Sequence, residues 1–142
     1  YAPERNELYL ARRGEGAWLG ERRLSISGGV PPQQALIMTG RGSAQPVDMH
    51  LEVLRRLLDR GFEYRRCGSG ALGLAEVAAG RLQGYAEPGM YAWDVAAARL
   101  IVAEAGGEIT PFPLEYPTQE LGPPVVGCRP GLLETLVETV RF

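Results

Sequence analysis

One stretch of the sequence decides the fold of this chain: Trp93-Asp94-Val95-Ala96-Ala97-Ala98-Arg99-Leu100-Ile101-Val102-Ala103-Glu104-Ala105-Gly106-Gly107. It predicts a helix from Asp94 to Ala105 that the two glycines end. Between the ends of this helix only Arg99 and Glu104 are charged, and the other residues are alanine or aliphatic. A helix that is apolar nearly all round is buried on most of its sides. We therefore expect a layered architecture, with this helix between two sheets or between a sheet and other helices.

Strands and helices alternate on both sides of this helix, which places the chain in the α/β class. Glycines punctuate short apolar runs from Leu8 to Ile26 and predict a hairpin or meander. Other strands are predicted at 35–39, 62–66, 82–86, 108–112 and 125–126, and other helices after Pro46, at 71–79 and from Pro130 onward. A proline-containing loop is predicted before Gly122.

The helix after Pro46 is expected to bury one apolar stripe. Val47, Leu51, Leu54 and Leu58 fall on one side of a helical wheel. Gly61 stands where a glycine ends a helix. Trp93, just before the decisive helix, is expected to be a core or cleft-wall aromatic.

Composition excludes several classes of function. The 142 residues carry a net charge of −2 without a polybasic block, which argues against nucleic acid or an anionic membrane as partner. The apolar runs are far shorter than the roughly 20 residues that span a bilayer. Two cysteines make no disulfide framework, and no Cys/His spacing suits zinc. The composition favours a cytoplasmic location.

Three places along the chain carry candidate functional residues. Asp94 lies at the start of the buried helix, where the helix dipole favours a carboxylate, and its other interpretation is a capping aspartate. Gly68-Ser69-Gly70 precedes a helix and is either a turn with a capping serine or a loop that holds phosphate. Glu87 precedes Pro88-Gly89 and is either a surface turn residue or a ligand contact.

These places occur in the order typical of one family. The stretch from Trp93 to Gly107 resembles the C-terminal signature of the inositol monophosphatase family, and Glu87 stands seven residues before Asp94, as that family places its substrate-contacting glutamate. Three further segments resemble the family's hairpin, small-residue loop and following helix: Arg12-Arg13-Gly14-Glu15-Gly16-Ala17, Gly68-Ser69-Gly70-Ala71 and Val77-Ala78-Ala79-Gly80-Arg81.

The resemblance implies a magnesium-dependent phosphomonoesterase that hydrolyses inositol phosphate or a related sugar phosphate with a metal-activated water. It implies that Asp94 is a catalytic residue and ligand of Mg²⁺, and that Glu87 binds a hydroxyl of the substrate ring. It also implies that Gly68, Ser69 and Gly70 line the substrate pocket. Oxygen ligands of this kind suit Mg²⁺, which keeps several waters.

The family's other metal-binding carboxylates are not found in this sequence. The aspartates are Asp48, Asp59 and Asp94, and none lies in the family's Asp-Pro-x-Asp-Gly loop. Residues 1–142 are therefore expected to form a single domain resembling the C-terminal half of the family fold, without the N-terminal half. Alone, the chain is expected to be inactive and to form a homodimer or bind the missing half.

Two other functions stay open. The absence of the acidic loop is also compatible with a non-catalytic interaction module derived from the same half of the fold. A small nucleotide-binding domain that uses Gly68 to Gly70 for phosphate is a weaker alternative, because the loop matches neither the P-loop nor the dinucleotide-binding spacing.

Overall fold

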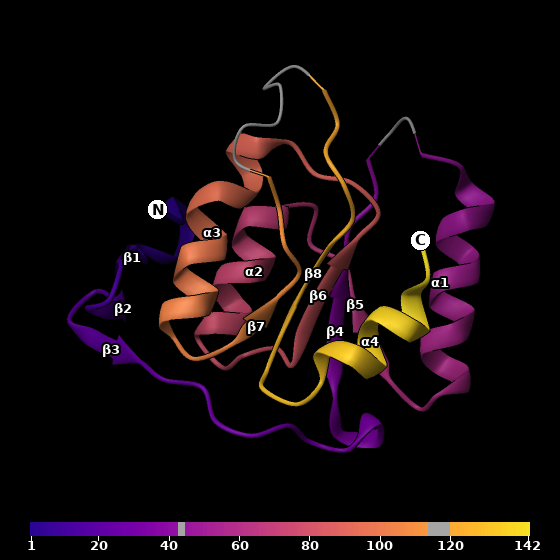
Figure 1. The fold of residues 1–142 in the computed structure, drawn as a ribbon, viewed down its shortest axis with the longest axis horizontal. Helices are drawn as coiled ribbons and strands as arrows, with labels where there is room; N and C mark the ends of the chain where they lie inside the picture. The colour runs from indigo at the N-terminus through magenta and orange to yellow at the C-terminus, as the bar shows by residue number, and fades with distance from the viewer. Residues whose placement is uncertain (43–44, 114–119) are drawn as a thin grey trace.

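The computed structural model describes residues 1–42, 45–113 and 120–142. These form two sheets and the helices that pack on them (Figure 1). Part of the proline-containing loop predicted before Gly122 lies outside the described residues. The strands are β1 (Tyr9–Arg12), β2 (Gly16–Leu19), β3 (Arg22–Leu24), β4 (Leu36–Thr39), β5 (Glu63–Arg65), β6 (Gly84–Glu87), β7 (Glu108–Ile109) and β8 (Val125–Cys128). The α-helices are α1 (Val47–Asp59), α2 (Gly70–Ala78), α3 (Ala92–Glu104) and α4 (Leu133–Val140), and short 3₁₀ helices span Pro3–Arg5 and Pro32–Gln34.

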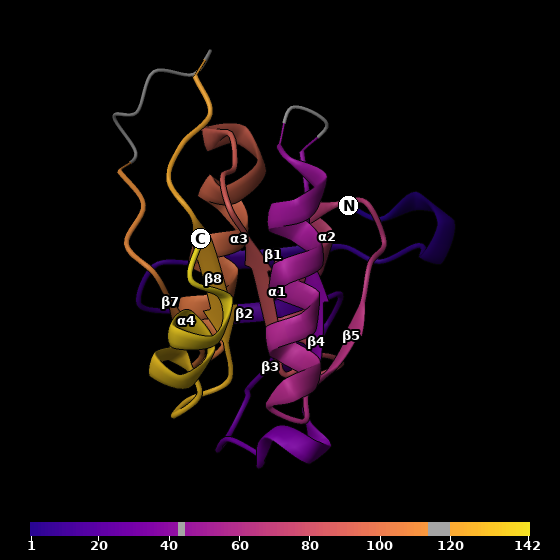
Figure 2. The same cartoon turned by 90° about the vertical axis from the view of Figure 1, so that its right-hand side faces the viewer.

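The larger sheet is mixed and has the strand order β5-β4-β6-β8-β7. Strand β4 is parallel to both β5 and β6, whereas β8 runs antiparallel to β6 and β7. Successive side chains of a strand point to opposite faces of a sheet. Met38 and Tyr85 accordingly pack with α2 and α3, and Ile37 and Ala86 pack with α1 and α4. Helices α1 and α4 cover one face of this sheet (Figure 2).

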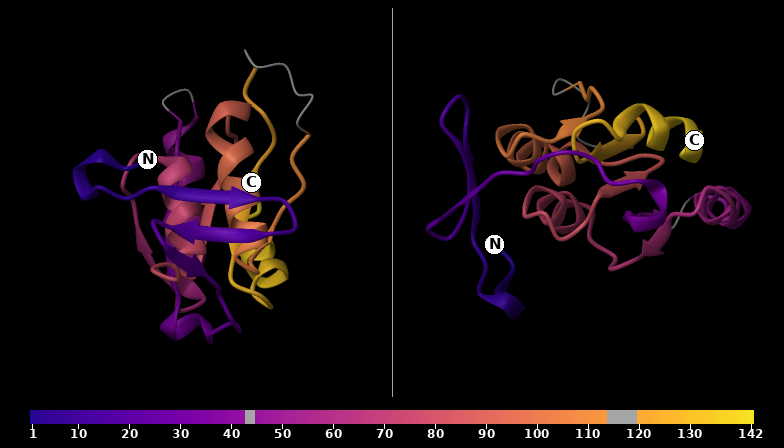
Figure 3. Two further views of the ribbon diagram at one scale, coloured as in Figure 1. Left: turned by 90° about the vertical axis from the view of Figure 1, so that its left-hand side faces the viewer. Right: turned by 90° about the horizontal axis from the view of Figure 1, so that it is seen from below.

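The smaller sheet is an antiparallel meander of β1, β2 and β3. It lies across α2 and α3, on the side away from the larger sheet (Figure 3). Helix α3 contacts β1 and β2 on one side and β7 and β8 on the other. Its buried residues include Val95, Ala98 and Val102. The predicted α/β class and the position of this helix between two sheets are therefore confirmed.

The apolar stripe predicted for α1 is wrong. Val47, Leu51 and Leu58 are 59%, 56% and 51% exposed, and the residues that α1 buries are Val53 and Leu57. This helix carries apolar residues on two sides, so its own periodicity does not determine which side turns inward. The position of the sheet and of α4 determines it, because Val53 and Leu57 pack into the cluster that these elements form.

Among the described residues, no helix is long and apolar enough to cross a membrane.

Helix α3 and the β1–β2 hairpin are joined through one carboxylate. The two oxygens of Glu104, the last residue of α3, accept hydrogen bonds from the backbone N–H groups of Gly14 (2.8 Å) and Gly16 (3.0 Å). Both glycines have positive φ angles, +76° and +118°, which favour glycine over other residues. The turn of the hairpin is therefore held against the end of the central helix.

Replacing Glu104 by alanine is expected to lower the free energy of unfolding by about 1–2 kcal/mol, because two backbone donors lose their acceptor. Chemical denaturation of the chain, followed by circular dichroism, measures this loss. The control is Glu15→Ala, which removes an exposed ion pair with Arg12 and is expected to cost less than about 0.5 kcal/mol. Equal losses in the two variants would mean that Glu104 does not hold the hairpin.

Candidate active site

The predicted site residues gather at one edge of the larger sheet. Strands β5, β4 and β6 are parallel, so their carboxyl ends lie at the same edge, and ligands of α/β proteins commonly bind beside this edge. Glu87 is the last residue of β6, and Gly68-Ser69-Gly70 leads from β5 into α2. Asp94 lies in the first turn of α3, which follows β6.

Glu87 is half-buried and held by a neighbour on its own strand. The hydroxyl of Tyr85 donates a hydrogen bond of 2.5 Å to Oε2 of Glu87. Tyr85 itself is 1% exposed, and burial together with the charge of Glu87 raises the pKa of its hydroxyl. The carboxylate of Glu87 therefore has a fixed orientation, and the interpretation of Glu87 as a surface turn residue does not fit this geometry.

Burial has the largest effect on the pKa of the Glu87 carboxyl group. Burial raises the pKa of its carboxyl group, and the charge of Asp94 raises it further. The hydrogen bond from Tyr85 and the positive charge of Arg66 act in the opposite direction without cancelling the rise. The charge of Asp94 thus reaches Glu87, the other predicted acid.

Asp94 does not cap its helix. Helix α3 begins at Ala92, two residues earlier than predicted, and Tyr91 occupies the capping position without a side-chain hydrogen bond. The side chain of Asp94 is half-buried and forms no hydrogen bond or ion pair with any residue that the structure describes. Burial raises the pKa of its carboxyl group. The sequence alternative of a capping aspartate is therefore wrong, and this carboxylate has no local structural role.

The glycine-serine-glycine loop serves three local purposes. Gly68 has a φ of +82°, a conformation that favours glycine. Ser69 caps α2, because its Oγ accepts a hydrogen bond of 3.3 Å from the backbone N–H of Leu72. Gly70 lets the helix approach the Tyr85–Glu87 pair: a Cβ atom here would lie 2.9 Å from the Tyr85 hydroxyl oxygen and 3.1 Å from Glu87 Oε2.

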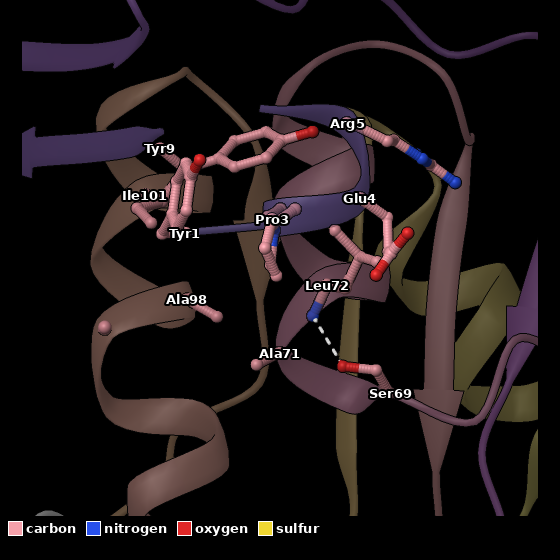
Figure 4. Close-up of a pocket in the computed structure, with 13 residues that line it drawn as sticks. Tyr1, Pro3, Glu4, Arg5, Tyr9, Ser69, Ala71, Leu72, Ala98 and Ile101 are labelled. Atoms are coloured by element: carbon pink, nitrogen blue, oxygen red, sulfur yellow. Dashed lines mark hydrogen bonds between the residues drawn. The ribbon is translucent and has the colours of Figure 1, made fainter. Parts of the chain in front are cut away.

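A separate pocket of about 390 Å³ lies on the outer side of α2 and α3, beneath the N-terminal segment (Figure 4). Its walls include Tyr1, Pro3, Ala71 and Ala98. Of the five predicted site residues, only Ser69 borders it, and neither carboxylate does. We therefore place the candidate site at the sheet edge and not in this pocket.

Of the two roles expected for Trp93, the core position is wrong, and the cleft-wall position stays a prediction. Its side chain is 60% exposed and stacks on Tyr91 with 4.5 Å between ring centroids and an interplanar angle of 8°. The outward position follows from its place in the first turn of α3, where Ala92 and Val95 take the buried side.

The described residues offer few ligands to a hard metal ion. Among the described residues, no group of three or more His, Cys, Asp and Glu side chains lies together in a way that could hold one. Asp94 nevertheless fits the role of a single ligand, because its carboxylate is half-buried, lacks a partner and has its pKa raised by burial. An oxygen ligand of this type suits Mg²⁺, which commonly takes only one or two protein carboxylates.

Sequence analysis missed Tyr85 and Gly40 as parts of this site. Tyr85 is two residues from Glu87 on one strand, so the two side chains share a face of the sheet. Gly40 follows β4, and a Cβ atom there would collide with the Tyr85 hydroxyl and the Glu87 carboxylate. An alternating polar pair at the end of a buried strand is a signal that could have identified Tyr85, whereas Gly40 is recognised only from the strand pairing.

Residues 1–141 match the model of the inositol monophosphatase family. The Nus factor SuhB of Escherichia coli strain K12 is 36% identical over 143 residues, which cover 99% of this chain and 53% of that protein. The chain therefore spans about half the length of the curated relatives that it matches.

Two solved structures are similar to this fold. The IMPase of Thermotoga maritima superposes with a TM-score of 0.83 at 28% identity, covering 99% of this chain and 54% of that one. SaIMPase-II from Staphylococcus aureus, crystallised with inositol monophosphate bound, superposes with a TM-score of 0.75 at 25% identity, covering 96% of this chain and 53% of that one.

The Tyr85–Glu87 hydrogen bond generates a prediction on ionisation. Because this bond favours the charged form of the carboxylate, Tyr85→Phe is expected to raise the pKa of Glu87 further. Carboxyl-carbon NMR titration measures the change. Tyr9→Phe is the control, since Tyr9 donates to Glu7, whose pKa is about 2, and its loss should leave the titration of Glu87 unaltered. An unshifted Glu87 in Tyr85→Phe would contradict the assignment.

Proposed function

The chain belongs to the inositol monophosphatase family, and on this premise we propose that it supplies the substrate-contacting half of a magnesium-dependent phosphomonoesterase. Its substrate is inositol phosphate or a related sugar phosphate. The observation that carries this proposal is the carboxylate of Asp94, which is half-buried, unpartnered and within electrostatic range of Glu87. A buried acid without a partner is costly to a fold, and such groups concentrate at functional sites.

Asp94 is assigned as the magnesium ligand of this half. Its position in the first turn of α3 directs it to the same edge of the sheet as Glu87 and the start of α2. A bound Mg²⁺ supplies positive charge that stabilises the oxygen leaving a phosphate ester. The part played by Asp94 is to hold that charge at a defined place, because α3 is packed between the two sheets.

Glu87 is assigned as the contact to the substrate ring. The Tyr85 hydroxyl donates a hydrogen bond to Oε2 of Glu87. The other oxygen of Glu87, Oε1, has no hydrogen-bond partner among the described residues. A carboxylate oxygen accepts hydrogen bonds from hydroxyl groups, so Oε1 is suited to a ring hydroxyl of a polyol or sugar. Tyr85 positions this oxygen by holding the other one.

Gly68, Ser69 and Gly70 are assigned to the wall of the substrate pocket. All three border a small cavity beside Glu87. The first amide groups of a helix have no partner within the helix, and Gly70 is the first residue of α2. We assign substrate contact in this segment to backbone groups, because the Ser69 hydroxyl already caps the helix.

Catalysis is proposed to need more than these residues. One carboxylate binds a hydrated ion weakly, and positioning of water and phosphate contributes orders of magnitude to such reactions. The chain spans about half the length of its relatives, so the remaining carboxylates would come from a complementary half, in the same protein or in a partner. Alone, the chain is proposed to be inactive and to associate with itself or with that half.

A second candidate is a non-catalytic interaction module. Several relatives carry the name of a Nus factor, which is not the name of an enzyme, and among the described residues no group of three or more His, Cys, Asp and Glu side chains could hold a metal. That nucleic acid is not a partner remains a prediction from the net charge. The two candidates separate in one assay, because the module has no magnesium-dependent turnover in any assembly.

Asp94→Asn tests the enzyme proposal. The chain is joined to the portion of the E. coli relative that it does not match, and phosphate release from myo-inositol 1-phosphate is measured with and without Mg²⁺. The variant is expected to lose at least about a hundredfold in kcat/KM, because the magnesium ion loses an anionic ligand. Asp48→Asn is the control, since Asp48 also lies in the first turn of a helix and should retain full activity. Unchanged turnover in Asp94→Asn would remove Asp94 from the mechanism.

Glu87→Gln tests the ring contact in the same assembly. Glutamine keeps the size of the side chain but weakens acceptance of hydroxyl hydrogen bonds. The kcat/KM for myo-inositol 1-phosphate is expected to fall about tenfold more than that for p-nitrophenyl phosphate, which has no ring hydroxyls. Equal losses on the two substrates would argue that Glu87 acts on the fold or the metal and not on the ring.

A further inference from the structure

Helix α1 presents an apolar stripe to solvent. The α1 stripe consists of Val47, Leu51, Leu54 and Leu58; Leu54 is half-buried, and the other three side chains are more than half exposed. Their spacing of four, three and four residues is typical of a helix that packs along another helix. The α1 stripe therefore has the pattern of a contact between helices, yet most of it is open to solvent in the described part of the chain.

The stripe faces the outer edge of the larger sheet. On the opposite side of α1, Arg56 donates hydrogen bonds of 3.2 Å to the backbone carbonyls of Val140 and Arg141, at the end of α4. Strand β5 is the edge strand of the sheet and lies on the side of α1 away from α4 (Figure 2). Tyr64 of β5 stands in register with Ile37, whose side chain packs with α1, so both side chains point to the face that α1 covers. Tyr64 is 36% exposed and adds aromatic surface beside the helix.

The backbone of β5 directs hydrogen-bonding groups away from the sheet. The N–H of Glu63 donates a hydrogen bond of 3.1 Å to the carbonyl of Ala35, next to β4. Backbone groups of successive strand residues point to opposite sides, so the N–H and C=O of Tyr64 point to the outer edge. The Tyr64 carbonyl accepts a hydrogen bond of 2.9 Å from the Arg65 side chain, and its second lone pair can accept another. An edge of this kind is a template for a further strand.

The charges of β5 are complementary to their own reverse. Its three residues are Glu63, Tyr64 and Arg65, and all are exposed. When two copies of this strand pair antiparallel around Tyr64, each Glu63 lies opposite the second copy's Arg65. Opposite charges directly across a strand pair stabilise it. A surface that matches its own reverse is what a two-fold interface between identical chains needs, so the occupant that this face fits is a second copy.

One axis serves both the strand and the helix. Counted from the turn at Gly61, the centre of the α1 stripe lies about 13 Å along the helix at about 1.5 Å per residue, and Tyr64 lies about 10 Å along the strand at about 3.3 Å per residue. The two centres are therefore at similar heights. Paired strands are about 4.8 Å apart and packed helices about 8–10 Å apart. Because α1 contacts β5 and packs on Ile37 of β4, its stripe reaches the second copy's stripe when the strands pair.

From these observations we propose that the α1 stripe and the edge of β5 bind the same face of a second copy, antiparallel around a two-fold axis beside Tyr64. In this dimer, Leu51 lies against the second copy's Leu54, and the two β5 strands join the larger sheets. The inference rests on the self-association in the proposed function, to which it gives a surface and a geometry, and on no catalytic role.

Sedimentation velocity of the chain over a range of concentrations measures the dimer. Leu51→Glu brings two unpaired carboxylates into an apolar contact and is expected to raise the Kd of the dimer at least about a hundredfold. Met49→Glu is the matched control, because Met49 is also exposed but lies about 200° round the helix from Leu51. Its dimer should be unaltered. A monomeric parent chain, or equal effects of the two variants, would overturn the proposal.

A charge exchange on β5 tests the antiparallel alignment. Glu63→Arg places like charges opposite each other twice in the dimer and is expected to raise the Kd about tenfold. Adding Arg65→Glu to this variant makes the opposed charges attractive again and is expected to restore the parent Kd. A double variant as weak as Glu63→Arg alone would contradict the pairing around Tyr64. Circular dichroism shows whether each variant keeps the fold, which is expected because the substituted side chains are exposed.

The assembly used for Asp94→Asn distinguishes a second copy from the complementary half as the occupant of this face. It is expected to form a dimer with the same sensitivity to Leu51→Glu. A monomeric assembly beside a dimeric chain would mean that the complementary half covers the face, and would overturn the proposal. Turnover is a separate readout: a dimer without magnesium-dependent turnover contradicts the proposed enzyme alone, and turnover by a monomeric assembly contradicts the dimer face alone.

Discussion

The hydrogen bond between Tyr85 and Glu87 fits into this fold only because three glycines surround it. A Cβ atom on Gly40 would collide with both partners, and one on Gly73 would lie 2.5 Å from the buried Tyr85 ring. One on Gly70 would lie 2.5 Å from the methyl carbon of Met90 and 2.9 Å from the Tyr85 hydroxyl oxygen. Protein interiors are close-packed, so a tyrosine that is 1% exposed cannot withdraw from such a contact. The lack of a side chain at these three glycines thus determines the orientation of the Glu87 carboxylate.

The arrangement of the sheets and helices brings further residues of the candidate site to this pair. Alternation along β6 directs Tyr85 and Glu87 to the face covered by α2 and α3, and the parallel pairing with β4 brings Gly40 beside them. Helix α3 then carries Asp94 to the same edge, because its small residues let it pack between the two sheets. The site and the core therefore share one set of packing contacts. A change that loosens α3 would move Asp94 relative to Glu87.

The sequence predicted the features that depend on the composition of a segment. It did not predict the features that depend on how distant segments are placed relative to one another. The apolar, alanine-rich stretch has few alternatives to burial, so the α/β class, the layers and the place of α3 were predictable. The inward face of α1 was not, because Leu51 and Leu58 are as apolar as Val53 and Leu57, and only the sheet distinguishes them. Gly40 and Tyr85 are 45 positions apart in the sequence, and only the parallel pairing of β4 with β6 brings them together.

The charge of Asp94 also affects the ionisation of Glu87, and this effect connects the proposed roles of the two residues. Burial raises the pKa of both carboxyl groups, and the charge of Asp94 adds to the rise at Glu87. A cation held by Asp94 would offset that charge, so it would favour the ionised form of Glu87, which is the form that accepts hydrogen bonds from a ring hydroxyl. The positive charge of Arg66 acts on Glu87 in the same direction. In this arrangement, a cation held by Asp94 and the charge of Arg66 would both favour the ionised form of Glu87, the carboxylate that is proposed to bind the substrate.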